Sequence, residues 1–256
     1  MWKYECALPR RAVAGTIKSM KFLSACIFAL LTATAVHAEE ASLALPSGET
    51  LTYSRYRAAS GDLLLWFASE RGLAPAEIQA ARDLAAQGTT VWQIDLVTAF
   101  FLPQTNSSLD GVSARDVQAI FAEARKTGAK VTVYAVNRAA VPVLKALAGE
   151  GGVRTPVMLM HPHFYSSVDT LVGADYLSFG NLQGVEALIL QPRRSAATPW
   201  VGDQIAALSR EGANAQLLML EGVREGYWVR ESANEFEIAE GKRLAERIAE
   251  WRKKLK

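Results

Sequence analysis

The sequence predicts a mainly parallel β-sheet with helices on both faces. Short apolar runs alternate with helical patterns along the chain, and most runs are almost continuously apolar, as strands covered on both faces must be. Glycine also follows most of the predicted helices, which is typical of a left-handed helix stop. The 256 residues, 50% hydrophobic and 21% charged, suffice for one sizeable core and exclude a disordered chain or a disulfide-knotted miniprotein.

Six apolar runs are predicted to be interior strands, and one alternating run is predicted to be an edge strand. The interior strands are 62–67, 90–96, 130–136, 156–161, 186–191 and 213–220. The run 51–56 alternates between apolar and polar residues, as a strand with one solvated face does.

The predicted helices begin and end at recognisable residues. Pro75 begins the first helix, which ends at Gly88, and Ser113 caps the second, which ends at Gly128. The third helix follows Asn137 and ends near 149–152. The fourth runs from about Pro199 to Gly212, and the last spans about 235–254. No internal repeat or low-complexity linker interrupts this series. We therefore expect a single domain over residues 39–256.

The N-terminal segment is predicted to be an export signal. Residues 20–38 combine a Met-Lys start, an apolar stretch of 15 residues over 22–36, and small residues at Val36 and Ala38 that suit a signal peptidase. The stretch is shorter than the roughly 18 to 20 residues of a membrane span. We expect cleavage after Ala38 and a periplasmic or secreted protein. Residues 1–19 are then explained most simply by a start codon assigned too early, with Met20 the true start.

Cleavage after Ala38 would change the charge and the cysteine content. It removes five basic residues and one acidic residue from totals of 28 and 26, and so leaves a formal charge of −2. That charge gives no support for nucleic-acid binding. Both cysteines, Cys6 and Cys26, are removed as well, so the mature chain has no disulfide, thiol nucleophile or cysteine metal site. We expect no cofactor.

Three turns after predicted strands resemble those of the α/β-hydrolase family. In that family a Gly-x-Ser-x-Gly turn carries the nucleophile, an acid follows a later strand, and a histidine follows the last strand. The corresponding turns here are Ala135-Val136-Asn137-Arg138-Ala139, Pro192-Arg193-Arg194-Ser195-Ala196 and Glu221-Gly222-Val223-Arg224-Glu225-Gly226-Tyr227-Trp228. The resemblance covers most of the chain after residue 38 and implies an α/β-hydrolase-like three-layer sandwich.

The resemblance also implies that all three triad positions are substituted, by Asn137, Ser195 and Glu225. An asparagine amide is not a usable nucleophile, so we expect no acyl-enzyme chemistry at Asn137. We predict instead that the former active-site edge binds a small apolar or anionic ligand, or an envelope protein. The alternative is an atypical hydrolase in which Glu225 or His161 activates water and Asn137 positions it.

Further candidates follow predicted strands, at the sheet edge where parallel α/β proteins bind ligands. The candidate ligand-binding residues are Ser69, Phe100, Phe101, Arg138, His161, His163, Arg224, Tyr227 and Trp228. Each group of these residues allows two interpretations. The arginines either receive an anion or form structural salt bridges, the aromatic residues are divided between core and pocket wall, and Ser69 belongs either to an anion-binding turn or to a tight connection. No metal site is predicted, because His161 and His163 would need two or more further ligands, such as Glu225 or Glu70, and a histidine at a strand end is more often a hydrogen-bonded wall residue.

Overall fold

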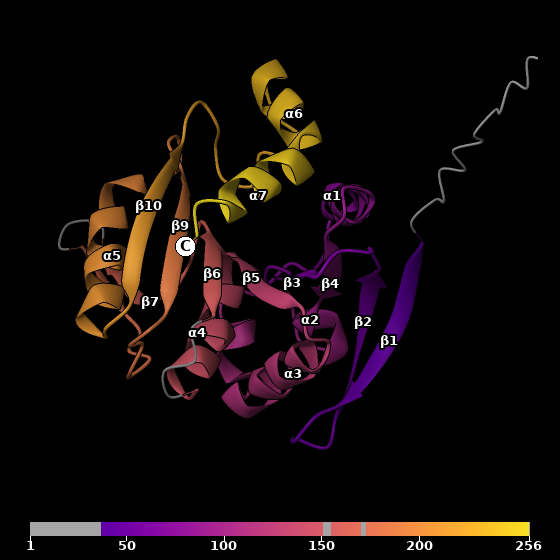
Figure 1. Cartoon of the computed structure of the whole chain (residues 1–256). Helices are drawn as coiled ribbons and strands as arrows, with labels where there is room; N and C mark the ends of the chain where they lie inside the picture. The colour runs from indigo at the N-terminus through magenta and orange to yellow at the C-terminus, as the bar shows by residue number, and fades with distance from the viewer. Residues whose placement is uncertain (1–36, 151–154, 170–172, 256) are drawn as a thin grey trace, which may run out of the picture. The chain divides into compact units, whose positions relative to one another are not determined.

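The structure is a computed structural model that describes residues 37–150, 155–169 and 173–255, so the predictions for residues 1–36 lie outside it. Eight strands form one sheet in the order β1-β2-β4-β3-β5-β6-β9-β10, with β1 and β10 at its two edges (Figure 1). The bounds are β1 Ala38–Ala44, β2 Thr50–Tyr56, β3 Asp62–Phe67, β4 Thr90–Ile94, β5 Lys130–Val136, β6 Pro156–Met160, β9 Glu186–Pro192 and β10 Asn214–Leu220. The β1–β2 and β2–β4 pairs are antiparallel, and the others are parallel.

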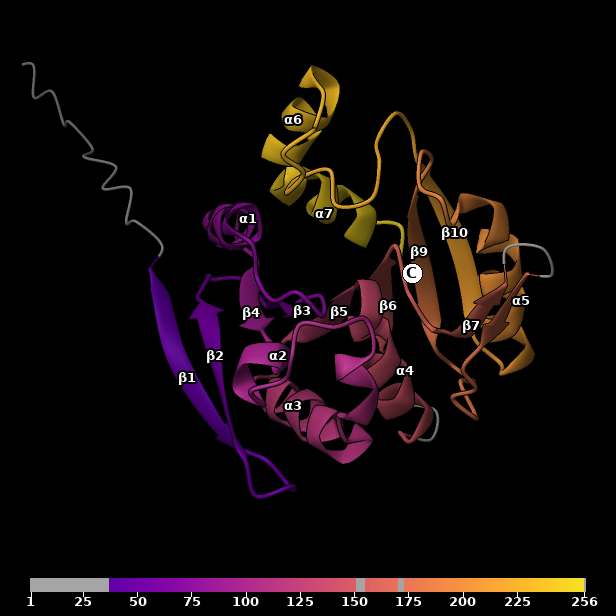
Figure 2. The same cartoon turned by 180° about the vertical axis from the view of Figure 1, so that it is seen from behind.

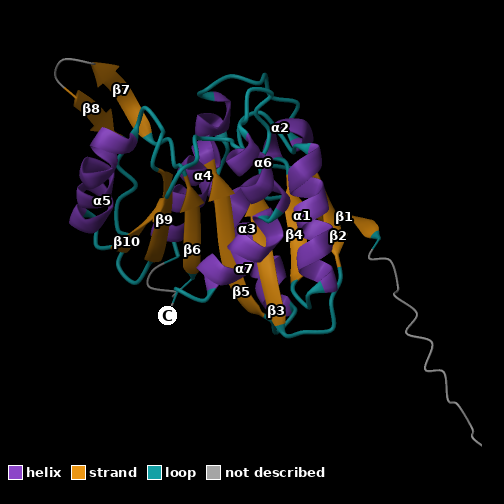
Figure 3. Cartoon of the chain, turned by 90° about the horizontal axis from the view of Figure 1, so that it is seen from above, coloured by secondary structure: helices purple, strands orange, loops and turns teal. Residues whose placement is uncertain are grey.

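Helices cover both faces of this sheet (Figures 1 and 2). One face carries α2 Leu96–Ala99, α3 Ala114–Lys126, α4 Ala140–Ala148 and α5 Val201–Arg210, and the other carries α1 Pro75–Ala86 and α7 Leu244–Arg252, which follows α6 Glu235–Lys242. Seen from above, α1 and α7 lie over the strands on the near side (Figure 3). The predicted three-layer sandwich is therefore confirmed.

Alternation along the strands divides the apolar residues between two cores. In β3, Leu63, Leu65 and Phe67 pack toward α3 and α4, whereas Leu64 and Trp66 pack toward α1 and α7. All five are buried. Successive side chains of a strand point to opposite faces, so a continuous apolar run supplies both cores at once.

The edge-strand prediction for 51–56 is wrong, because β1 pairs along the outer side of β2 from Ala38 to Ala44. The interior-strand prediction for 213–220 is also wrong, because β10 forms the opposite edge of the sheet and only Leu220 in it is buried. Most β1 side chains are exposed, which removes the apolar signal that marked the interior strands. The strand predicted over 90–96 ends at Ile94. Asp95 caps α2 there, since its Oδ1 accepts the Thr98 N–H at 3.0 Å.

The single helix predicted over 235–254 is interrupted at Arg243, where α6 ends and α7 begins. Gly241 lies just before the break, and a Cβ added to it would come within 3.2 Å of the Trp228 Cα. Glycine is a poor helix former, and this close approach needs it. The connection 163–184 also contains the antiparallel strands β7 Tyr165–Asp169 and β8 Gly173–Tyr176.

Across the part of the chain that the structure describes, no helix combines the length and apolar character needed to cross a membrane.

Candidate functional site

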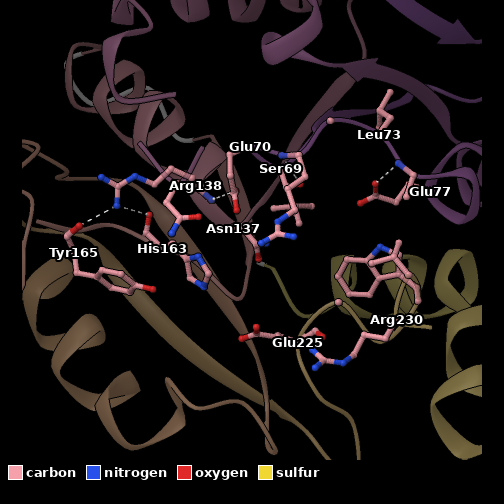
Figure 4. A pocket seen from close by; sticks show the side chains of 18 residues that line it. Ser69, Glu70, Leu73, Glu77, Asn137, Arg138, His163, Tyr165, Glu225 and Arg230 are labelled. Carbon is pink, nitrogen blue, oxygen red and sulfur yellow. Dashed lines mark hydrogen bonds between the residues drawn. The ribbon is translucent and has the colours of Figure 1, made fainter. Parts of the chain in front are cut away.

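The carboxyl ends of the central strands surround a cavity of about 690 Å³ (Figure 4). Its walls come from the segments that follow β3, β5, β6 and β10, which bring residues far apart in the sequence to one sheet edge. Its lining includes the polar and aromatic residues Ser69, Glu70, Arg71, Glu77, Asn137, Arg138, His163, Tyr165, Glu225, Trp228 and Arg230. The volume falls within the roughly 300–1,000 Å³ of small-molecule sites.

Asn137 occupies a strained turn directly after β5. Its φ is 50°, in the left-handed region, and a short 3-10 turn, Asn137–Ala139, leads from it into α4. Asparagine is among the non-glycine residues that best tolerate this region, although the conformation still costs on the order of 1–3 kcal/mol. The Asn137 carbonyl accepts the His163 N–H at 3.1 Å, which ties the turn to the segment after β6.

The backbone N–H that follows Asn137 is already occupied. The Arg138 N–H donates to Glu70 Oε2 at 3.1 Å, in a buried bond that joins the turn after β3 to the turn after β5. Glu70 is only 3% exposed. A carboxylate therefore fills the position in which this N–H would otherwise meet a ligand atom.

The arginine side chains at this edge mainly form structural contacts. The Arg138 guanidinium pairs with Asp110, with Nε–Oδ1 at 2.6 Å, and donates to the Tyr165 carbonyl at 2.9 Å. Arg224 points away from the cavity lining and pairs with buried Glu237. The salt-bridge interpretation therefore describes both side chains.

Arg71 and Arg230 differ from those arginines. Both line the cavity, and neither guanidinium has a carboxylate partner at ion-pair distance among the described residues. The one polar contact of the Arg230 guanidinium within that part of the chain is a 3.2 Å bond to the Glu225 carbonyl. These two cations are available to an anionic group.

A second polar cluster joins the ends of β6, β9 and β10. His161 Nε2 lies 2.6 Å from Ser195 Oγ, and Ser195 donates to Glu225 Oε2 at 3.2 Å. The Ala197 N–H donates to the same serine oxygen at 3.2 Å. His161 is 2% exposed and has a φ of 47°, so a second left-handed residue lies at this edge.

Burial keeps the two histidines at this edge neutral. Burial lowers the pKa of His161 from 6.5 to about 3, with a smaller contribution from neighbouring His163. Burial likewise lowers the pKa of His163. Both imidazoles are therefore neutral near pH 7, and each can offer a nitrogen lone pair as a base or a ligand.

A neutral histidine beside a serine hydroxyl is an arrangement that can generate a nucleophile. In the Ser-His-acid relay, however, the acid holds the far nitrogen of the imidazole. Here Glu225 Oε2 lies 3.3 Å from Nε2, the same nitrogen that faces Ser195. Nδ1 is buried without a hydrogen-bond partner among the described residues. The cluster thus lacks the orientation of that relay.

The remaining predicted residues divide between wall, core and surface. Ser69 and Trp228 line the cavity, His161 lines an adjoining cavity of about 190 Å³, and Tyr227 is buried in the core beneath α7. Phe100 packs against the core near α2, whereas Phe101 is 93% exposed. Neither phenylalanine belongs to the lining of the large cavity.

Sequence reasoning missed Glu77 as part of the site. Glu77 is buried in the third position of α1, where its Oε2 accepts the Ala74 N–H at 2.8 Å. Burial raises the pKa of this carboxyl from 4.5 to about 7. A glutamate in the first helical turn is common, and nothing in the sequence marks this one as buried.

Comparison with known proteins identifies the fold. No family model matches the sequence, and no curated protein matches it. A putative dienelactone hydrolase from Klebsiella pneumoniae subsp. pneumoniae superposes with a TM-score of 0.61 at 14% identity, over 85% of this chain and 98% of that one. Esterase Est22 gives 0.62 at 13% identity, over 86% and 81%.

The chain has the α/β-hydrolase fold. Esterase LipW from Mycobacterium marinum is a further similar structure, with a TM-score of 0.55 at 15% identity over 84% of this chain and 83% of that one. In α/β hydrolases the nucleophile lies on a sharp strand-to-helix turn, and the acid and histidine follow it in the sequence. Asn137, Ser195 and Glu225 follow β5, β9 and β10 in this structure.

Proposed function

We propose that this protein is a non-catalytic relative of the α/β hydrolases that binds a small anionic molecule in the cavity at the carboxyl ends of the strands. The observation that carries the proposal is the bond from the Arg138 N–H to the Glu70 carboxylate. In working α/β hydrolases the N–H after the nucleophile stabilises the oxyanion. A carboxylate in that place opposes the negative charge that an acyl-transfer transition state develops.

The substitution at the turn supports the same conclusion. Asn137 keeps the left-handed backbone of the turn but supplies an amide in place of a hydroxyl. The side-chain amide of asparagine is not among the groups that a neighbouring base activates as a nucleophile. The backbone geometry of a hydrolase is thus present around a side chain that cannot carry its chemistry.

The ligand class follows from the cavity wall. Two carboxyl groups of the lining are already engaged, Glu70 by the Arg138 N–H and Glu225 by the Ser195 hydroxyl. Arg71 and Arg230 supply positive charge without carboxylate partners among the described residues, and Tyr165 and Trp228 supply apolar surface. Guanidinium groups bind carboxylates and phosphates through paired hydrogen bonds. A small aromatic or aliphatic acid fits this combination of charge and surface.

The test is a thermal-shift panel of small carboxylates, phosphates and uncharged analogues on the purified protein. We expect at least one anion to raise the melting temperature, and Arg71→Ala to reduce that shift. Arg115→Ala is the matched control, because Arg115 is an exposed arginine on α3 that does not line the cavity. Absence of any shift, or an equal shift in Arg71→Ala, would overturn the proposal.

A second candidate function is hydrolysis by the His161–Ser195–Glu225 cluster, favoured by the 2.6 Å contact between His161 Nε2 and Ser195 Oγ. A panel of p-nitrophenyl esters separates it from the first. The binding proposal expects no turnover above a buffer blank. Turnover in the parent that Ser195→Ala abolishes, with Asn137→Ala unchanged, would establish hydrolysis at the cluster.

Export remains a proposal that rests on residues 20–38 of the sequence. N-terminal sequencing of protein recovered from the periplasm of a bacterial host tests it. A mature protein beginning at Glu39 would support cleavage after Ala38. An intact N-terminus in the cytoplasmic fraction would contradict it.

A further inference from the structure

We infer that His161, His163 and Glu225 form a binding site for a divalent transition-metal ion, with Zn²⁺ as the best match. One ligand atom from each of these side chains lies within 4.8 Å of the other two. Two imidazoles and one carboxylate form a donor set that zinc uses in proteins. Hard ions such as Mg²⁺ and Ca²⁺ prefer oxygen ligands alone.

The spacing within the cluster fits a shared ion. His161 Nε2 and Glu225 Oε2 lie 3.3 Å apart. Two ligands bonded at about 2.1 Å to a tetrahedral zinc ion are separated by roughly 3.4 Å. The rings of His161 and His163 lie with their centroids 4.5 Å apart, and His163 and Glu225 extend toward each other in Figure 4. Little movement is needed to bring all three ligands onto one ion.

The backbone holds both histidines in place. His161 lies in a left-handed turn at the end of β6, and its N–H donates to the Leu190 carbonyl at 2.8 Å. The His163 N–H donates to the Asn137 carbonyl at 3.1 Å. Two histidines only two residues apart are therefore fixed against β9 and the β5 turn. Strained backbone held by its surroundings is characteristic of functional sites.

The Ser195 hydroxyl lies between the two proposed ligand atoms that are nearest to each other. Its Oγ is 2.6 Å from His161 Nε2 and 3.2 Å from Glu225 Oε2. A polar atom therefore already bridges these two atoms, and an ion bound there would replace the contact between Ser195 and Nε2. Nε2 is the ligand atom of His161 in this site; Nδ1, which is buried without a hydrogen-bond partner among the described residues, does not bind the ion.

The site opens toward space that a further ligand can reach. All three residues line the cavity of about 190 Å³, and His163 and Glu225 also line the large cavity. Three protein ligands with one coordination position facing a cavity is the pattern of open zinc sites. From the sequence, Glu225 is one possible further ligand, but a histidine at a strand end is more often a hydrogen-bonded wall residue; the arrangement of β6 and β10 is what brings Glu225 to the histidines.

The test is metal titration of the chelator-treated full chain, by calorimetry with Zn²⁺ and by visible absorption with Co²⁺. We expect one equivalent to bind, with Co²⁺ bands of tetrahedral intensity. His163→Gln and Glu225→Gln should each weaken Zn²⁺ binding by at least ~10-fold. Glu221→Gln is the control, because Glu221 is an exposed carboxylate on the same connection that pairs with Arg193 outside the cluster.

Far-UV circular dichroism of each variant separates loss of a ligand from loss of the fold. Glu225 is partly exposed, so Glu225→Gln keeps the test valid if a histidine variant misfolds. Binding that is absent in the parent, or unchanged in both folded variants, would overturn the site. Failure of metal binding would leave the anion proposal standing, because the thermal-shift panel tests Arg71 and contains no added metal.

Discussion

At the scale of single residues, Glu70 joins the turn after β3 to the turn after β5. Its Oε2 accepts the Arg138 N–H in a buried environment. We expect Glu70→Ala to lower the free energy of unfolding by about 1–3 kcal/mol, because the substitution leaves that N–H buried without an acceptor. Urea unfolding followed by tryptophan fluorescence measures the change.

Two further variants identify the cause of that loss. Glu70→Gln retains an acceptor oxygen and should lose less stability than Glu70→Ala. Glu231→Ala removes an exposed carboxylate and should stay within about 0.5 kcal/mol of the parent. Equal losses in Glu70→Ala and Glu231→Ala would show that the Glu70 bond contributes nothing.

Glu77 should make stability depend on pH. Burial raises its pKa to about 7 in the folded protein, against an ordinary value of 4.5. Between these values the folded state holds a proton that the unfolded chain has released. The contribution of Glu77 is therefore complete below about pH 4.5 and is lost as the pH rises through 7.

We expect the stability difference between the parent and Glu77→Gln to fall as the pH rises from 5 to 8. Urea midpoints at several pH values measure it, and taking the difference cancels groups common to both proteins. His161 is one such group, and its sign is opposite: its lowered pKa makes its contribution fall as the pH drops below 6.5. Glu49→Gln, at an exposed position, should follow the parent at every pH; a constant difference for Glu77→Gln would contradict the prediction.

The sequence located part of the site, and contacts distant along the chain account for the rest. Asn137 and Glu225 are predicted at this edge because each lies in a turn that follows an apolar run and resembles a triad turn of the α/β-hydrolase family. The Glu70–Arg138 bond spans 68 positions, and no local pattern reveals it. The sequence also does not show whether a charged side chain after a strand points into the cavity or away from it. Arg71 lines the cavity, whereas Arg224 pairs with Glu237 of α6.

At the scale of elements, the connection after β10 is fixed to α6 by one buried carboxylate. Glu237 has no exposed surface and accepts the backbone N–H groups of Arg224 at 2.9 Å and Asn234 at 3.1 Å. It also pairs with the Arg224 guanidinium. Glu237 thus fixes the position of Arg224, and Glu225, which lines the cavity, is the next residue in the chain.

We expect Glu237→Ala to lower the free energy of unfolding by about 1–3 kcal/mol and to increase amide exchange over residues 221–234. Hydrogen-exchange mass spectrometry reads both global and local effects. Glu235→Ala is the control in the same helical turn, where an exposed carboxylate contributes a few tenths of a kcal/mol to about 1 kcal/mol through the helix dipole. Exchange that stays unchanged over 221–234 would show that other contacts hold the connection.

Elements with a strong local signal were predicted well. Strands β3 and β5 have the predicted bounds, and α1 and α3 begin at the predicted residues. Exposed β1 offers little apolar contrast and was missed. Just before the break between α6 and α7, Gly241 approaches Trp228, a contact between segments that periodicity along one helix does not show.

At the scale of the whole molecule, the sheet couples its two cores. Leu65 and Leu64 are neighbours in β3 but pack on opposite faces, and the same alternation places Val133 and Tyr134 of β5 on opposite faces. Because neighbouring residues of one strand belong to different cores, a strand that leaves one core also removes its residues from the other. The two faces should therefore unfold together.

We expect Phe121→Ala on α3 and Ile248→Ala on α7 each to lower the free energy of unfolding, by about 3–5 and 2–5 kcal/mol, in a single transition. Trp92 lies in the α3-side core and Trp66 in the α7-side core, so fluorescence samples both while far-UV circular dichroism follows the backbone. Phe101→Ala, at an exposed position, should change stability by less than about 0.5 kcal/mol. Different unfolding midpoints by fluorescence and by circular dichroism in either core variant would mean that one helical layer unfolds before the other. The coupling through alternating strand residues would then be too weak to make the domain a single cooperative unit.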